Sequence, residues 1–430
     1  MNDSRRRILL ATGAGIALGT LGACAMPGGR AGAPARAQVV VVGGGYGGAT
    51  AAKYIRMWSD NTIDVVLVEP DAAFVSCPFS NLVIGGTRRM ADITVPYDGL
   101  ERAHGVRRVR DTVTRIDTAA RKVSLAGGAT IGYDKLVVSP GIDFMYDDLP
   151  GLRPAAAREQ VPHAWKAGPQ TVALRRQLEA MPDGGVFAMA IPRAPYRCPP
   201  GPYERACMVA AYFKREKPRS KVLVLDGNDD VTSKGKLFKA AWAEHYKGLI
   251  EYRPSHTLMD VDVPGRELRF EFDDPVRAAV LNVIPPQRAG SIAVEAGLVT
   301  ANDRWCEVNF IDFESIVASD VHVLGDSIQP AAEMPKSGHM ANQQAKVCAA
   351  AIVAKLSGRP INDSPLTMNT CYSFVTETEV IHVASVHAWD AQRRTYLPVE
   401  GAGGLSAAPS EAEGLAANAW ARNIWADMLA

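Results

Sequence analysis

The chain has 430 residues, 47% of them hydrophobic, which is enough for two or three domains that each bury a core. The formal net charge is only +1, so no charge excess points to nucleic acid or to an anionic membrane as a partner. Seven cysteines are ordinary for this length, so their positions matter more than their number.

Residues 1–37 are predicted to form an export signal rather than part of the fold. The basic segment SRRR (4–7) precedes the apolar stretch ATGAGIALGTLGA, which is too short to span a bilayer. This pattern resembles a twin-arginine signal, which carries folded, cofactor-loaded proteins. We therefore expect a periplasmic mature protein without a transmembrane segment. Cleavage is predicted after Ala37. The alternative is a lipidated N-terminus at Cys24.

The next stretch predicts a dinucleotide-binding unit. The apolar run AQVVVV predicts a buried strand, and GGGYGG then places Gly43, Gly45 and Gly48 in the G-x-G-x-x-G spacing before a small-residue helix. Glycines let the backbone approach a pyrophosphate, and the helix N-terminus offers unpaired N–H groups. Glu69 ends the following strand, DVVLVE, where it is placed to hold ribose hydroxyls. A purely structural glycine turn is the weaker alternative.

Later stretches favour FAD over NAD at this unit. YDKLVVSPG is typical of two-dinucleotide flavoproteins, and VHVLGD is typical of their second FAD fingerprint, in which Asp326 reaches the ribityl chain. Lys336 is expected to place positive charge near the flavin N1 and O2, and a solvated loop lysine is the alternative. Cys77, on the loop after the second strand, should lie near the flavin ring. A small buried hydrophobe is the alternative there.

A second α/β domain is predicted over residues 151–285, on the strand–helix–strand plan of an NAD domain. Its first turn, RAPYRCPPGPYE, is not glycine-rich, and prolines remove N–H donors. We therefore expect that NAD binding is lost. The turn presents Cys198, and Glu204 follows about one helical turn later. A rigid surface loop is the alternative.

The remaining chain predicts the second half of the FAD-binding domain and a third domain. The FAD-binding domain comprises residues 38–150 and 286–356, and residues 357–430 form a C-terminal α+β interface domain whose first strand is opened by Cys371. The predicted fold class is thus α/β, with two Rossmann-like domains of disulfide-reductase type plus this interface domain.

The last helix is predicted from a capping box and an apolar stripe. Ser410 and Glu413 have capping-box spacing. One face then carries Trp420, Ile424 and Met428, with Trp425 at its edge. Packing in the core and contact with a partner or membrane both remain open for this face. His339 is predicted to pack or to form hydrogen bonds rather than to catalyse, and Cys207, Cys306 and Cys348 are predicted to be buried thiols in helix or strand patterns.

Six segments in this order resemble the flavoprotein subunit of flavocytochrome c sulfide dehydrogenase: GGGYGGATAAKYI, SNLVIGG, PHAWKAGPQT, CPPGPYERA, VIPPQRAG and MPKSGHMANQQAKV. The resemblance extends over roughly residues 38–430. It implies a periplasmic FAD enzyme that oxidises sulfide to sulfur or polysulfide and passes electrons to a cytochrome c subunit. Motif by motif, it implies a covalent bond from Cys77 to the flavin 8α-methyl, a redox-active pair of Cys198 and Cys371, and an acid, Glu204, beside them.

The implied chemistry suits these residue types. Hydrosulfide attacks a disulfide readily, which gives a persulfide and a thiolate that can pass electrons to the flavin. Which cysteine is attacked stays open. No C-x-x-C-H segment occurs, so haem is expected only on a partner subunit, and no metal site is predicted. The alternatives are a membrane-associated sulfide:quinone reductase, a relative of the NADH-dependent disulfide reductases, and a non-catalytic flavin-binding electron carrier.

Overall fold

The strand β1 (Gln38–Val42) lies inside a seven-stranded sheet of the computed structural model, which describes residues 36–430. The predicted export signal, with Cys24, therefore lies outside the described residues except for its last two positions. The strand order is β19-β20-β21-β9-β1-β2-β5, with bounds Val308–Asn309, Glu314–Ser315, Val321–Val323, Lys135–Val138, Gln38–Val42, Asp64–Val68 and Arg107–Val109. β1 pairs in parallel with β2 and β9, and a parallel strand covered on both faces must be apolar throughout.

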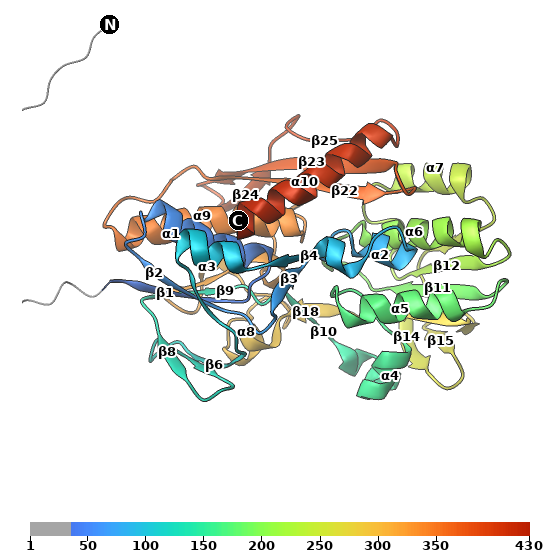
Figure 1. Cartoon of the computed structure of the whole chain (residues 1–430), viewed down its shortest axis with the longest axis horizontal. Helices are drawn as coiled ribbons and strands as arrows, with labels where there is room; N and C mark the ends of the chain where they lie inside the picture. Colours follow the sequence, from blue (N-terminus) through green and yellow to red (C-terminus); the bar gives the residue numbers. More distant parts are fainter. Residues whose placement is uncertain (1–35) are drawn as a thin grey trace, which may run out of the picture. The chain divides into compact units, whose positions relative to one another are not determined.

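Two helices, α1 (Tyr46–Trp58) and α9 (Gly338–Leu356), pack against each other beside this sheet (Figure 1). Small buried residues of α1, such as Ala49 and Ala52, allow the close approach of α9. The smaller elements of this part are β3 (Ala73–Val75), α2 (Ser80–Gly85), β4 (Thr94–Pro96), α3 (Asp98–His104), β6 (Val113–Asp117), β7 (Lys122–Leu125), β8 (Thr130–Gly132) and α8 (Ser291–Glu295).

A second parallel sheet has the order β13-β12-β11-β17, with bounds Ile250–Arg253, Lys221–Asp226, Val186–Ile191 and Val280–Val283. Its helices are α5 (Pro169–Ala180), α6 (Gly201–Glu216) and α7 (Gly235–His245), and Figure 1 shows them around this sheet. The antiparallel pair β10 (Ile142–Phe144) and β18 (Gln287–Ala289) lies where the chain leaves and re-enters the first part. Further elements are α4 (Ala155–Gln160), β14 (Leu258–Asp262), β15 (Glu267–Phe270) and β16 (Val276–Arg277). The predicted α/β class with two Rossmann-like sheets is confirmed.

The C-terminal part is an antiparallel sheet with one long helix. The sheet contains β22 (Leu366–Phe374), β23 (Val380–Asp390), β24 (Thr395–Pro398) and β25 (Gly404–Leu405). Cys371 lies inside β22 rather than at its start, because the pairing with β23 already begins at Leu366. Within residues 36–430, no helix combines the length and the apolar composition that crossing a bilayer requires.

The helix α10 (Glu411–Leu429) begins with only half of the predicted capping box. The Ser410 hydroxyl accepts a hydrogen bond from the Glu413 N–H at 3.2 Å, as predicted. The Glu413 carboxylate turns away and accepts from the Ser406 hydroxyl at 2.6 Å. The helix packs on both β23 and α1 and thereby joins the C-terminal sheet to the first part of the molecule (Figure 1).

Candidate active site

A cavity of about 350 Å³ opens at the carboxyl ends of β1, β2, β9 and β21. In parallel α/β sheets this edge is where ligands bind. One wall is the glycine loop after β1, and the opposite wall comes from the loop before α6 in the second sheet. The middle of β22 and Trp420 of α10 complete the lining. All three parts of the fold therefore contribute to one site.

The glycine loop is built for a close backbone approach. Gly43 has a φ of +93°, and a Cβ there would lie 2.4 Å from the Ser139 carbonyl oxygen. A Cβ on Gly48 would lie 1.8 Å from the Gly43 carbonyl oxygen. Around Gly45 nothing lies within 4 Å of the corresponding position. Gly43 and Gly48 thus require glycine for the fold. Gly45 leaves open space beside a helix N-terminus, where a pyrophosphate fits.

Glu69 anchors this loop as well as facing the cavity. Its carboxylate accepts hydrogen bonds from the Gly44 N–H at 2.6 Å and from the Asp71 N–H at 2.8 Å. Burial raises the pKa of Glu69 above its usual range, although these two N–H donors oppose the shift. Tyr97 donates to the Gly44 carbonyl at 3.0 Å and closes the same turn.

Asp326 and Lys336 lie together in the lining of the cavity. The Asp326 Oδ1 is buried without a hydrogen-bond partner among the described residues, so a ligand hydroxyl would satisfy it. The Lys336 ammonium donates to the Asp326 carbonyl at 2.9 Å, lies 3.5 Å from the centre of the Trp305 ring and is buried. Burial lowers the pKa of Lys336 to about 7. The alternative of a solvated loop lysine is therefore wrong. Together, the glycine cradle, the open space at Gly45 and the unpaired Asp326 oxygen fit an FAD molecule.

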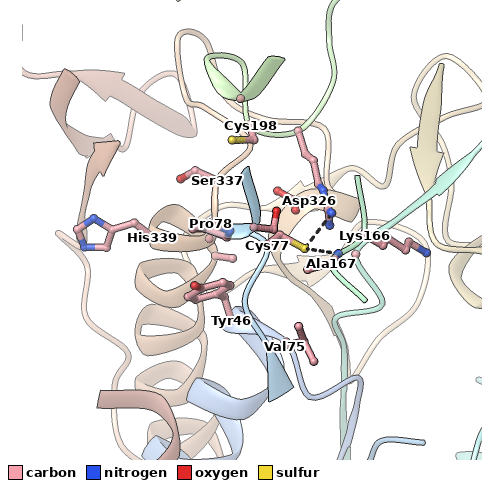
Figure 2. A pocket seen from close by; sticks show the side chains of 18 of the residues that line it. Tyr46, Val75, Cys77, Pro78, Lys166, Ala167, Cys198, Asp326, Ser337 and His339 are labelled. Atoms are coloured by element: carbon pink, nitrogen blue, oxygen red, sulfur yellow. Dashed lines mark hydrogen bonds between the residues drawn. The ribbon is translucent and has the colours of Figure 1, made fainter. Parts of the chain in front are cut away.

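Cys77 lies in the cavity wall between β3 and α2 and is only half-buried. Its sulfur accepts a hydrogen bond from the Ala167 N–H at 3.4 Å and one from the Arg197 guanidinium at 3.1 Å, both drawn in Figure 2. A sulfur that faces a cavity and receives two donors is not a small core hydrophobe, so that alternative does not describe Cys77.

Cys198 and Cys371 come from different parts of the fold and meet in the cavity. Cys198 has a φ of +56°, and its N–H donates to the Lys336 carbonyl at 2.8 Å. Its thiol lies close to that of Cys371, so that each affects the protonation of the other, and both are free thiols in this structure. The neighbouring Cys198 thiol, helped by the nearby Lys234 ammonium, lowers the pKa of Cys371 below its usual range. The three cysteines that were predicted to be buried thiols, Cys207, Cys306 and Cys348, are fully buried.

Glu204 lies directly beside this pair. Its two carboxyl oxygens accept hydrogen bonds from the Asn81 amide at 2.7 Å and from the Phe374 N–H at 2.9 Å. Burial raises the pKa of Glu204 above its usual range, and the same two donors counteract part of that shift. The loop before α6 is thus not a plain surface loop, because it places a cysteine and an acid in the cavity.

Three buried polar residues of the site were not predicted. Asn81 bridges two side chains, since it donates to Glu204 and accepts from Arg205 at 3.0 Å. Arg205 also donates to the His163 carbonyl at 2.8 Å. Lys234 donates to the Cys371 carbonyl and to the Ser373 hydroxyl, each at 2.8 Å. No local pattern marks these residues, because each gains its role from segments distant in sequence.

The aromatic face of α10 turns inward. Trp420 lines the cavity, and its ring centre lies 5.8 Å from that of His339. Trp425 donates to the Tyr46 hydroxyl at 3.2 Å, and Ile424 and Met428 are buried. His339 accepts from the Thr370 N–H at 2.9 Å, in the hydrogen-bonding role predicted for it. Of the two possibilities for this helix, core packing is the one the structure shows.

One Rossmann-like sheet carries a nucleotide cradle. A cysteine pair faces it, where a second nucleotide-binding turn would otherwise lie. This arrangement defines a flavoprotein of the disulfide-oxidoreductase class. Family models agree. Residues 37–179 match pyridine nucleotide-disulphide oxidoreductase, residues 171–285 match the central part of the sulfide dehydrogenase [flavocytochrome c] flavoprotein chain, and residues 363–429 match the flavin-binding part of flavocytochrome c sulphide dehydrogenase. The chain is thus similar to flavin-dependent sulfide-oxidising oxidoreductases of two kinds, flavocytochrome c sulfide dehydrogenases and sulfide:quinone oxidoreductases.

The individual similar proteins include both kinds. The flavoprotein chain of sulfide dehydrogenase [flavocytochrome c] from Chlorobaculum thiosulfatiphilum is 65% identical over 46 residues, which are 11% of this chain and 94% of that sequence. The mitochondrial sulfide:quinone oxidoreductase of Dictyostelium discoideum is 24% identical over 84% of this chain and 82% of its own length. The structure of the sulfide:quinone oxidoreductase from Aquifex aeolicus has a similar fold, with a TM-score of 0.74, 18% identity and 91% of each chain covered.

Proposed function

We propose that this protein oxidises sulfide to sulfur or polysulfide through Cys198, Cys371 and FAD, and that it passes the electrons to a c-type cytochrome subunit in the periplasm. The closeness of the two thiols inside the cavity carries the proposal, because it brings together a cysteine of the loop after β11 and a cysteine of β22. FAD, when bound, accepts electrons in pairs and releases them singly, which suits a haem acceptor.

The protein's own groups divide the sulfide chemistry among them. In the oxidised enzyme Cys198 and Cys371 form a disulfide. Hydrosulfide attacks one sulfur, the S–S bond breaks, and the second sulfur leaves as a thiolate. Glu204, within the same cavity, accepts the proton that the hydrosulfide loses. The buried Lys234 ammonium lies beside Cys371 and stabilises negative charge on that pair.

The electron acceptor is tested by turnover. Anaerobic assays with sulfide should show rapid reduction of an isolated c-type cytochrome and little reduction of a soluble ubiquinone analogue or NAD⁺. Preference for the quinone would instead support the second candidate, a sulfide:quinone reductase, to which the long match with the Dictyostelium enzyme points. Failure of sulfide to reduce the flavin at all would leave only a non-catalytic flavin carrier. Recovery of the mature protein from the cytoplasm would contradict the proposed location.

We propose that the Cys77 sulfur, which lies in the cavity wall, bonds covalently to the flavin. The flavin should therefore remain on the protein after acid denaturation. Cys77→Ser should release its yellow colour into the supernatant while still binding FAD before denaturation, since Gly43, Glu69 and Asp326 are unchanged. The measurement is flavin absorbance in the acid pellet and supernatant. Cys207→Ser, which changes a fully buried thiol outside the cavity, is the matched control. Complete release from the unaltered protein would end the proposal of a covalent bond.

The proposed cytochrome partner is expected to dock on the outer face of β22. Leu366 and Met368 are 59% and 50% exposed, and the same strand reaches the cavity at Thr370 and Cys371. Because β22 links this exposed apolar surface directly to the site, Met368→Glu should raise the KM for the cytochrome by about tenfold.

The docking test needs two controls. Sulfide oxidation with ferricyanide as acceptor should stay unchanged in Met368→Glu, since the cavity is untouched. Phe272→Glu alters an equally apolar side chain, 88% exposed, that lies on the loop after β15. An equal loss of cytochrome reduction in Phe272→Glu, or no loss in Met368→Glu, would show that the cytochrome does not dock on β22.

A further inference from the structure

Arg197 connects the two cysteine-bearing segments of the site. It precedes Cys198 in the loop before α6, and its guanidinium reaches across to the Cys77 sulfur at 3.1 Å. The same nitrogen donates to the Trp165 carbonyl. The Arg197 N–H donates to the Gln287 side chain at 3.0 Å, so the residue is held at its backbone and at its tip. Within residues 36–430, no carboxylate lies at ion-pairing distance from this guanidinium.

We propose that Arg197 is the positioning residue for covalent attachment of the flavin to Cys77. It holds the sulfur against the cavity and stabilises the negative charge that the sulfur carries when it attacks. This inference rests on the attachment proposed above and adds the group that promotes it. Nothing in the sulfide chemistry requires a guanidinium beside Cys77, so the contact needs an explanation of its own.

The chemistry of attachment shows why a cation is useful there. The thiolate, not the thiol, is the nucleophile, and a guanidinium that donates a hydrogen bond to the attacking sulfur can stabilise the negative charge during the attack. The new C–S bond replaces the S–H bond of Cys77 and one C–H bond of the flavin methyl group. Two protons leave, and two electrons remain on the flavin until the proposed one-electron acceptor removes them. The Ala167 N–H, at 3.4 Å from the sulfur, is the second donor to the same atom.

The geometry also makes attachment depend on the second sheet. Cys77 belongs to the first part of the fold, whereas Arg197 follows β11 in the second. The guanidinium reaches the sulfur only when the loop that carries Cys198 is in place. Attachment of the flavin is therefore expected only after the two sheets have come together around the cavity.

The test measures the rate of covalent attachment. Protein made under riboflavin limitation is saturated with FAD, and in-gel flavin fluorescence follows the attachment with time. In Arg197→Ala the flavin should become covalently attached at least about tenfold more slowly, while the variant still binds FAD without the bond. Guanidinium chloride below denaturing concentration should restore much of the rate in Arg197→Ala. Arg193→Ala, an exposed arginine of the same loop, should behave like the unaltered protein.

Attachment at the normal rate in Arg197→Ala, or no response of a slow variant to guanidinium, would overturn the inference. If Arg197→Ala fails to bind FAD, Arg197→Lys and Arg197→Gln replace it. The charged lysine should attach faster, and equal rates would refute a role for charge. Full release of flavin from the unaltered protein would refute attachment and this inference together. Bleaching of the bound flavin by sulfide tests the sulfide chemistry separately in the same samples.

Discussion

Cys198→Ser and Cys371→Ser are each expected to abolish the reduction of bound flavin by sulfide while the flavin stays bound. Either change removes the disulfide that hydrosulfide would attack, because a disulfide between these two positions needs both sulfurs. The residues proposed to hold the cofactor lie elsewhere, at the glycine loop and at Asp326. Stopped-flow absorbance of the flavin under anaerobic conditions measures the effect directly.

The matched control for this pair is Cys207→Ser. Cys207 is fully buried and accepts a hydrogen bond from the Trp242 indole at 3.2 Å, which a serine can also accept. This variant should keep the normal rate of flavin reduction. Near-normal reduction in either Cys198→Ser or Cys371→Ser would remove the disulfide from the mechanism and leave direct attack of sulfide on the flavin.

Glu204→Gln is expected to slow flavin reduction by about ten- to a thousandfold, the range typical of a lost proton acceptor. The carboxyl group sits beside both cysteines and must be ionised to accept a proton. Because burial raises the pKa of Glu204, the rate in the unaltered protein should rise with pH through that raised value. This step in the pH profile should vanish in Glu204→Gln. Glu216→Gln, at the exposed end of the same helix, serves as the control.

The same residue contributes to the pH dependence of stability. Its pKa is higher in the folded protein than the ordinary value of 4.5, so between the two values the folded state binds more protons than the unfolded state. The free energy of unfolding then falls as pH rises through this window. Glu204→Gln removes that part of the slope, and thermal melting at a series of pH values would detect its loss. A profile with an unchanged rate step and slope would show that Glu204 does not titrate in this range.

Local sequence patterns were sufficient for the cofactor side of the site. Strand, glycine turn, helix, strand and Glu69 lie within one short stretch, so their spacing already determines how they meet. The cysteine side was different. Cys198 and Glu204 stood out because prolines replace the expected glycines, but the meeting of Cys198 with Cys371 was implied only by family resemblance. Cys198 lies on the loop between β11 and α6, Cys371 lies in β22, and no periodicity relates them.

Buried polar contacts were the least predictable part. Asn81 and Glu204 are 123 positions apart, and their bond exists only because α2 and α6 pack together. Lys234 has an ordinary surface-like sequence context at the start of α7, yet the C-terminal sheet covers it. Lys336 is buried because Trp305 lies over it, which a local sequence pattern does not reveal. Whether a charged side chain is buried therefore depends on the distant segment of the chain that packs over it.

The wall formed by β22 and α10 has a consequence for the order in which the site can be made. A ribosome that has translated as far as Asp326 has already produced the glycine loop, Cys77, Arg197 and Cys198. It has not produced Cys371 or Trp420, which close the cavity from the other side. A nascent chain can therefore hold the cofactor's phosphate end before any redox pair exists. Sulfide would meet a competent disulfide only after the C-terminal sheet has emerged and folded onto the rest.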